Sequence, residues 1–330
     1  MVTYLLRRVM STAPTLVLIS MLVFLAIEIT PGTYVDILVA QQIRDTGSAT
    51  LTDGQVQLLE KQYGIGRPIY VRWWKWFSRF VRGDMGRSYA YGHRPVAKLI
   101  GERMALTMVI AFSSLAFSYL VALPIGIYSA VRQYTFGDHF FTGLSFLGLS
   151  VPNFLLALLL MITGFFVFGQ MPGGLFSPEY AEAPWSLAKV LDLLSRLWIP
   201  VFVLGTAGMA GTMRVLRGNL LDQLRRPYVE TARAKGLRET VLVVKYPVRL
   251  ALNPFITSLG LAFPGIVGGE LIVSIVLNLP TTGPLLFDAV MNHDAFLAGA
   301  MVMLLSSVLV LGNLLSDLAL AGIDPRIRYD

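Results

Sequence analysis

Two long stretches of this sequence, residues 104–131 and 140–178, contain no charged side chain. A helix needs about 20 apolar residues to cross a bilayer, so both stretches predict membrane spans. The whole chain is 55% hydrophobic and 14% charged, whereas a soluble domain carries about 25% charged residues. This balance excludes an ordinary water-soluble enzyme, and the high hydrophobicity excludes a disordered chain. The chain is therefore expected to be solvated largely by lipid.

The charge-free or nearly charge-free stretches predict an all-α integral membrane protein with six transmembrane helices. In the third stretch, Pro172, Gly173 and Gly174 place the helix end near Gly169. The fifth is interrupted only by Glu270. The six expected spans are residues 9–27, 104–131, 140–169, 197–213, 250–279 and 295–316.

The first span follows Arg7 and Arg8, a pattern that also occurs in signal peptides. Its apolar run is long for a signal peptide and no small-residue cleavage motif follows Ile27, so a retained helix is expected. The sequence has no cysteine, which excludes disulfides, thiolate catalysis and Cys-ligated metals.

Basic residues set the expected orientation. Nine Lys and Arg residues fall between positions 214 and 249, whereas the short loop at 280–294 has none. Because short cytoplasmic loops are enriched in Lys and Arg, both termini are expected to be cytoplasmic. The chain is then a single transmembrane domain, 1–330, with an extracytoplasmic segment at 31–103 and core helices over 104–320.

The extracytoplasmic segment contains two expected surface helices. Residues 51–63 form an amphipathic pattern that Thr52 or Asp53 could cap. Residues 70–81 interleave Trp and Phe with Arg and Lys, a mixture that favours the lipid headgroup layer. Nucleic-acid binding is the competing interpretation, and the expected orientation away from the cytoplasm argues against it.

The loop at 218–252 is far longer than a connection between two helices requires. Pro227 interrupts its first helix, and residues 228–234 restart as a short helix with Glu230 in the first turn, where a carboxylate suits the helix dipole. Gly236 stands where a left-handed residue ends a helix. We interpret this helix–Gly–helix unit as a docking element. The alternative is a solvated basic linker that contacts anionic lipid.

At this point the sequence resembles a family. Residues 230–236, Glu-Thr-Ala-Arg-Ala-Lys-Gly, with the later Asn253-Pro254, look like the EAA loop of ABC-importer permeases. The surroundings look like the peptide/opine/nickel branch, which contains dipeptide and oligopeptide permeases. The further matches, in family order along the chain, are Tyr4-Leu-Leu-Arg-Arg8, Gly83-Asp-Met-Gly-Arg-Ser88, Pro95-Val96, Gly268-Gly269 and Asp324-Pro-Arg-Ile-Arg328.

The resemblance implies a type I ABC importer permease fold and a permease subunit that forms half of a translocation pathway. It implies a homologous second permease, two cytoplasmic ATPase subunits, and an extracytoplasmic binding protein that delivers solute across a bacterial or archaeal inner membrane. No cofactor is expected on this chain, since ATP and Mg belong to the ATPase subunits. The ATPase-docking residues implied by the match are Tyr228, Glu230, Thr231, Ala232, Ala234, Lys235 and Gly236.

The family commonly has an acidic residue one turn after the paired glycines, at the position of Ser274, whereas here the acid is Glu270. Glu270, Ser274 and Asn278 would share one helix face and are expected in the pathway or its gate. A structural ion pair is the alternative for Glu270. Residues 277–283 also depart from the usual loop, which leaves a peptide-like or an oligosaccharide-like solute open.

Two other function classes compete with the permease hypothesis. A secondary transporter could use Glu270 as its ion carrier, but no second half of the sequence resembles the first. An intramembrane enzyme would need paired acids, a nucleophile or metal ligands, and the three histidines lie in separate loops. The sequence also lacks G-x-x-x-x-G-K-[ST], so any ATP that drives transport must bind another polypeptide.

Overall fold

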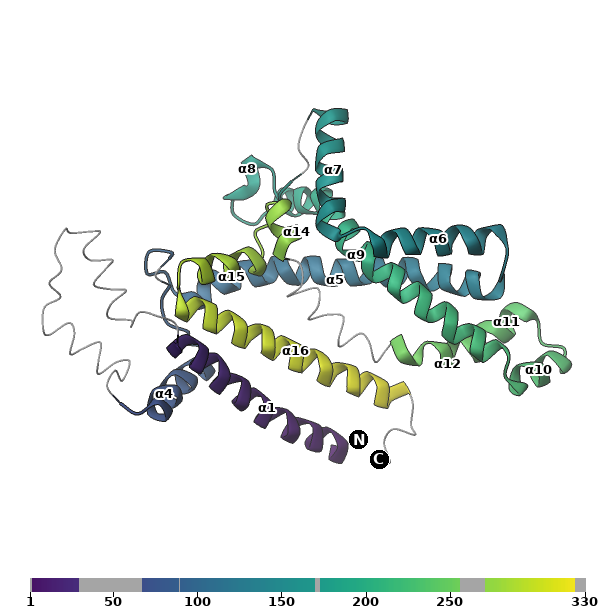
Figure 1. Ribbon diagram of the computed structural model, residues 1–330, viewed down its shortest axis with the longest axis horizontal. Helices are drawn as coiled ribbons and strands as arrows, with labels where there is room; N and C mark the ends of the chain where they lie inside the picture. The colour runs from purple at the N-terminus through teal and green to yellow at the C-terminus, as the bar shows by residue number, and fades with distance from the viewer. Residues whose placement is uncertain (1, 30–66, 89, 170–172, 256–270, 324–330) are drawn as a thin grey trace, which may run out of the picture. The chain divides into compact units, whose positions relative to one another are not determined.

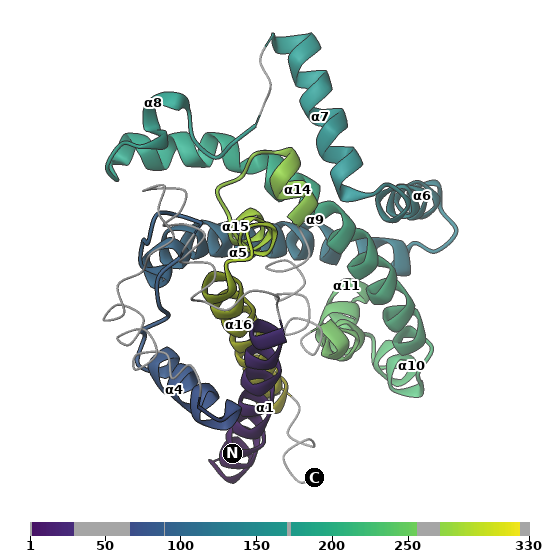
Figure 2. The ribbon, with the colours of Figure 1, turned by 60° about the vertical axis from the view of Figure 1, so that its left-hand side comes forward.

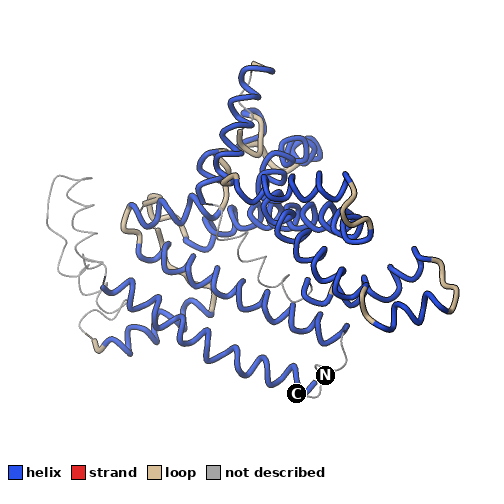
Figure 3. The backbone as a smooth tube through the Cα atoms, turned by 45° about the vertical axis from the view of Figure 1, so that its right-hand side comes forward, coloured by secondary structure: helices blue, strands red, loops and turns tan. Residues whose placement is uncertain are grey.

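The computed structural model describes residues 2–29, 67–88, 90–169, 173–255 and 271–323. Within these ranges the chain is helical, and the one extended pairing is a single β-bridge between Arg87 and Pro95 (Figure 3). The helices (Figure 1) are α1 (Val2–Ile29), α4 (Ile69–Val81), α5 (Val96–Val131), α6 (Phe136–Ser150), α7 (Asn153–Phe168), α8 (Pro178–Ala181), α9 (Leu187–Leu224), α10 (Pro227–Ala234), α11 (Glu239–Val243), the π-helix η1 (Val244–Val248), α12 (Arg249–Ala251), α14 (Leu271–Val276), α15 (Thr282–Met291) and α16 (Ala295–Ile323).

The chain divides into two compact units. The first, the core unit, consists of Met1–Arg8, Arg103–Pro284 and Val308–Asp330. The second, the flanking unit, consists of Val9–Glu102 and Leu285–Ser307. The 218–252 loop and both of the described candidate pathway residues, Ser274 and Asn278, belong to the core unit.

The described helices support part of the expected six-span arrangement. α5 and the Ala295–Leu315 part of α16 are long and apolar enough to cross a bilayer, and the α6–α7 pair adds a third span if it is counted as one. α1 contains the shorter apolar segment Met10–Ala26. Residues 256–270 of the fifth expected span, and the amphipathic segment 51–63, lie outside the described residues. Six spans therefore stays a prediction.

The third expected span is not one straight helix. α6 and α7 meet at a bend of 98°, and α7 leaves α6 steeply in Figure 2. Pro152 has no N–H to continue a helix, and it forces Val151 into an extended conformation with φ −85° and ψ 118°. The end of α7 agrees with the sequence, because Gly169 follows Phe168 with φ +69°.

α9 is the longest helix described, with 38 residues, and its first half holds the main apolar cluster of the core unit. Leu197, Val203 and Leu204 of α9 are buried there with side chains of α5, α7 and α14. α5 approaches α9 closely at Gly205, where an added Cβ would lie 3.1 Å from the Ser114 carbonyl oxygen. The Ser118 hydroxyl donates to the Gly205 carbonyl oxygen at 2.7 Å. Small residues and a hydroxyl thus join the two helices, as is common between membrane helices.

A bidentate ion pair joins α6 to the second half of α9. Asp138 accepts from Nε and Nη2 of Arg217, both at 2.8 Å, and its side chain is buried. The same carboxylate accepts from the backbone N–H of Tyr134 and the hydroxyl of Thr142. The pair therefore fixes the first turn of α6 against α9 immediately before the 218–252 loop begins.

In the flanking unit, α4 packs against α1 through part of its aromatic face. The Trp73 indole N–H donates to the Ser20 hydroxyl at 3.1 Å, and Arg72 pairs with Glu28 at 2.6 Å. These contacts leave Tyr70 and Trp74 exposed, Trp74 by 60%. The position of α4 in the headgroup layer stays a prediction, which concerns its exposed outer edge, because its inner rings contact protein.

We predict that Arg217→Ala lowers the free energy of unfolding by about 3 kcal/mol, because it leaves the buried Asp138 carboxylate without its cation. Thermal unfolding of the purified chain in detergent measures this change. Arg214→Ala is the matched control, since Arg214 is exposed on the same helix. Equal stability of the two variants would contradict the structural role of the ion pair.

Candidate functional site

The 218–252 loop has its own apolar cluster. Leu216 and Leu220 at the end of α9 are buried with Val229 of α10, Leu242 of α11 and Val248 of η1, and Ala130 of α5 completes the contact. Figure 1 shows α10, α11 and α12 following the C-terminal end of α9. The loop is therefore a packed extension of α5 and α9, and it is no solvated linker.

α10 begins at Pro227, one residue before the predicted start at Tyr228. Pro227 occupies its first turn, where the missing N–H costs nothing, and Glu230 lies in the same turn. The Tyr228 hydroxyl donates to the side-chain oxygen of Gln223 at 2.9 Å, and burial raises the pKa of Tyr228 above its ordinary value. This contact fixes the start of α10 to the last turn of α9.

Gly236 ends α10 in the left-handed conformation, with φ +76°, which confirms the prediction from sequence. The Gly236 N–H donates to the Arg233 carbonyl at 3.0 Å, and the Leu237 N–H donates to the Ala232 carbonyl at 3.4 Å. These two bonds form a Schellman motif, which needs a positive φ at the glycine. An added Cβ at Gly236 would meet no atom within 4 Å, so the backbone conformation alone demands glycine.

The two faces of α10 differ in chemistry. Val229 and Ala232 are buried three residues apart, on the face that packs into the loop's cluster. Among the residues implied for docking, those exposed are Glu230, Thr231, Ala234, Lys235 and Gly236, while Tyr228 is half-buried. The structure thus places Ala232 in the cluster, where it positions the helix, and leaves a small, polar outer face.

An ion pair connects the end of α10 to the start of α11. Arg233 donates to both carboxylate oxygens of Glu239, at 2.6 and 3.1 Å. The hydrogen bonds from Arg233 hold the pKa of Glu239 below its ordinary value. Both side chains are half exposed, so solvent weakens the attraction between them, and the pair serves mainly to orient the turn around Gly236.

The candidate pathway residues are only partly described. Glu270 lies outside the described residues, and Ser274 is buried in α14. α14 ends at Val276, and Asn278 is exposed with φ +51°, so the expected helical stripe does not continue to Asn278. Asparagine tolerates the left-handed region better than most residues, which explains the helix end here.

The variant loop 277–283 is anchored from two sides. The Leu277 carbonyl accepts from the Gly174 N–H at 2.7 Å. The Thr282 N–H donates to the Thr107 hydroxyl of α5 at 3.0 Å, and both threonines are buried. This loop is thus a packed connection between α14 and α15. Its contact with α5 joins residues far apart in the chain, so sequence patterns do not predict it.

Sequence reasoning also missed a buried carboxylate in the flanking unit. Asp294 accepts from the Ser88 hydroxyl, from the Ala90 N–H at 3.1 Å and from the Leu297 N–H at 3.1 Å. Phe296 lies beside Gly86, where an added Cβ would approach the ring to 3.1 Å. Residues 83–88, which resemble the permease family in sequence, are therefore held to the start of α16. Among the described residues, no three His, Asp or Glu side chains gather as a metal site.

Comparison with known proteins covers nearly the whole chain. Residues 122–329 match the family described as binding-protein-dependent transport system inner membrane component, and residues 1–111 match the N-terminal part of such membrane components. The chain belongs to this family. It is a permease subunit of an ABC importer, and catalysis of ATP hydrolysis lies in partner subunits.

Relatives of this permease match along their full length. The oligopeptide transport system permease protein AppB of Bacillus subtilis (strain 168) is 34% identical over 329 residues, with 100% of both chains covered. The glutathione transport system permease protein GsiC of Salmonella typhimurium (strain LT2) is 32% identical over 330 residues, again with 100% of both chains covered. The family implies partnership with an ATPase and a binding protein in a bacterial inner membrane.

Proposed function

We propose that this permease imports a peptide-like solute and that α10 is the helix on which a cytoplasmic ATPase subunit docks. The chain would form half of the pathway beside a homologous, different permease, with two ATPase subunits below and a binding protein outside. ATP and Mg would bind only to the ATPase subunits. Both termini would face the cytoplasm.

The two-sided chemistry of α10 is the observation that supports docking most strongly. Its apolar face packs into the cluster formed with α5, α9, α11 and η1, so a displacement of α10 would move these helices directly. Its outer face is small and polar, which suits contact with a soluble protein better than contact with lipid.

The two relatives favour a peptide-like solute, since one is an oligopeptide permease and the other a glutathione permease. An oligosaccharide-like solute is the second candidate, and the departures at Ser274 and in residues 277–283 support it. A binding screen of the partner binding protein with peptides and oligosaccharides distinguishes the two.

Glu270 and Ser274 are our candidates for the pathway or its gate, with Asn278 at its edge. A carboxylate in the middle of a span is costly and usually faces a cavity or a partner. Buried Ser274 lies one turn after Glu270 in sequence, which would place both side chains on one face if the helix continues.

We predict that Gly236→Val leaves the permease in the membrane but lowers uptake and solute-stimulated ATP hydrolysis at least about fivefold. A β-branched residue resists the left-handed region at a cost of about 1–2 kcal/mol, so the turn after α10 would reorganise. The measurements are peptide uptake by cells and ATPase activity of the reconstituted complex.

Gly236→Asn is the matched control for this experiment, because asparagine adopts a positive φ and the surrounding space is open. It should retain most of the uptake. A Gly236→Val protein that is present at the normal level and takes up peptide normally would overturn the docking assignment.

We predict that Glu182→Cys and Asn292→Cys react with a membrane-impermeant thiol reagent added to sealed cells, whereas Thr231→Cys does not. All three positions are exposed, and the native chain has no cysteine to give background. Thr231→Cys should react after the cells are opened. Labelling of Thr231→Cys in sealed cells would reverse the orientation and remove the docking proposal with it.

A further inference from the structure

A cleft of about 480 Å³ opens in the core unit between the last turns of α5 and the segment that follows Gly236. Its α5 wall includes Pro124, Ile127 and Val131, and its opposite wall includes Val243 and Val244. Aliphatic side chains therefore form part of both walls.

The charged groups at the cleft are arranged asymmetrically. Arg132 lines it at the C-terminal end of α5, is exposed, and has no acidic side chain within ion-pair distance among the described residues. The acid on the opposite wall is Glu239, which is already paired with Arg233. The cleft therefore combines an apolar interior with one available cation at its end.

The part of α5 that lines the cleft is slightly shorter than one half of a bilayer. Pro124 and Arg132 are eight residues apart, which corresponds to roughly 12 Å along a helix axis. One leaflet contributes about 15 Å of hydrocarbon. Because α5 is a candidate membrane span that ends at Val131, the Pro124 end would lie among acyl chains and Arg132 among headgroups.

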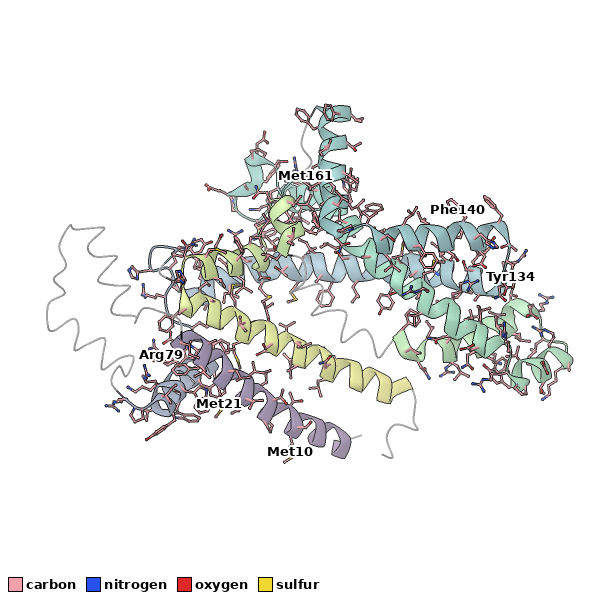
Figure 4. All side chains as sticks on the ribbon, viewed as in Figure 1. Met10, Met21, Arg79, Tyr134, Phe140 and Met161 are labelled. Atoms are coloured by element: carbon pink, nitrogen blue, oxygen red, sulfur yellow. The ribbon has the colours of Figure 1, made fainter. Side chains whose placement is uncertain are left out.

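Aromatic side chains also lie around the C-terminal end of α5, where Arg132 lines the cleft. Tyr128 lines the cleft one turn before Arg132, and its ring packs edge-on against Phe141 of α6. Tyr134, in the turn between α5 and α6, is 74% exposed, and Phe136, the first residue of α6, is 86% exposed. Figure 4 labels Tyr134 at this turn and Phe140 on the adjoining helix. Exposed aromatic side chains gather where a protein crosses the headgroup layer.

We propose that this cleft binds one acyl chain of an anionic phospholipid of the cytoplasmic leaflet, with the lipid phosphate at Arg132. Basic pockets beside membrane helices on the cytoplasmic side are suited to anionic headgroups. The assignment rests on the orientation given under Proposed function. A lipid here would contact both α5 and the segment after the docking helix, so its occupancy would stabilise the position of that segment.

The test measures phosphatidylglycerol retained by the full chain in nanodiscs of phosphatidylglycerol and phosphatidylethanolamine, by native mass spectrometry. We expect Arg132→Gln to weaken retention about fivefold, since one cation near the surface contributes about 1 kcal/mol. We expect Val244→Trp, which fills the cleft from an exposed position without changing charge, to abolish it. Nanodiscs of phosphatidylcholine should give no retained lipid.

Arg249→Gln is the matched control, because it removes one exposed cation of the core unit that lies outside the cleft. It should change retention by less than twofold. Equal losses in Arg132→Gln and Arg249→Gln, or full retention in Val244→Trp, would overturn the lipid site. If Arg132→Gln keeps its lipid but loses the ATPase subunits on purification, the cleft is a protein contact instead.

The amount of retained phosphatidylglycerol tests the lipid site independently of the proposed function. A wild-type chain that transports peptide but retains no phosphatidylglycerol contradicts only the lipid site. A chain that retains the lipid while Gly236→Val transports normally contradicts only the docking assignment.

Discussion

Helix α9 connects the two packed regions of the core unit without interruption. Its first half is buried against α5, α7 and α14, and its last turns are buried against the elements of the 218–252 loop. Its single proline, Pro200, lies in the first half, and no proline interrupts the helix from Val201 to Leu224, so a displacement of α10 would be passed along this second part of α9. The Asp138–Arg217 pair ties α6 to the same helix, so α6 is held to the position of α9 as well.

The docking proposal follows from this continuity. The chain has no phosphate-binding loop, so the energy for transport must enter through a contact with another subunit. α10 offers a polar outer face and an apolar inner face, and its ends are fixed by Tyr228 and by the Schellman turn at Gly236. A helix held in this way would transmit a movement of the docked ATPase subunit to α5 and α9. The proposed lipid would act on the same segment from its membrane side.

Local rules were sufficient for features that depend on a few neighbouring residues. Pro227 and Gly236 fix the limits of α10 through the proline ring and the left-handed glycine, and the charge-free stretch of α5 predicts a helix by composition. The expected span at 104–131 did not predict the start of α5. The helix begins at Val96 and includes charged residues near its start, one of which, Glu102, pairs with Arg94. The bend between α6 and α7 was also missed, although Pro152, which causes it, is evident in the sequence.

Long-range contacts were beyond sequence reasoning. Asp138 and Arg217 are far apart in the chain, and Asp294 finds Ser88 only after the fold is formed. After α14 ends, the Gly174 N–H donates to the Leu277 carbonyl, a long-range hydrogen bond that no sequence periodicity predicts. The docking set from sequence was thus close to the exposed face of α10, but it included Ala232, which the fold buries.

Photo-crosslinking from α10 tests the central claim most directly. A photoreactive amino acid replaces Glu230 in the assembled importer, with the exposed position Asn292 as the comparison site. The account predicts an adduct between position 230 and the ATPase subunit after irradiation of membranes, and no such adduct from position 292. The absence of any ATPase adduct from position 230, in a complex that still imports its solute, would contradict it.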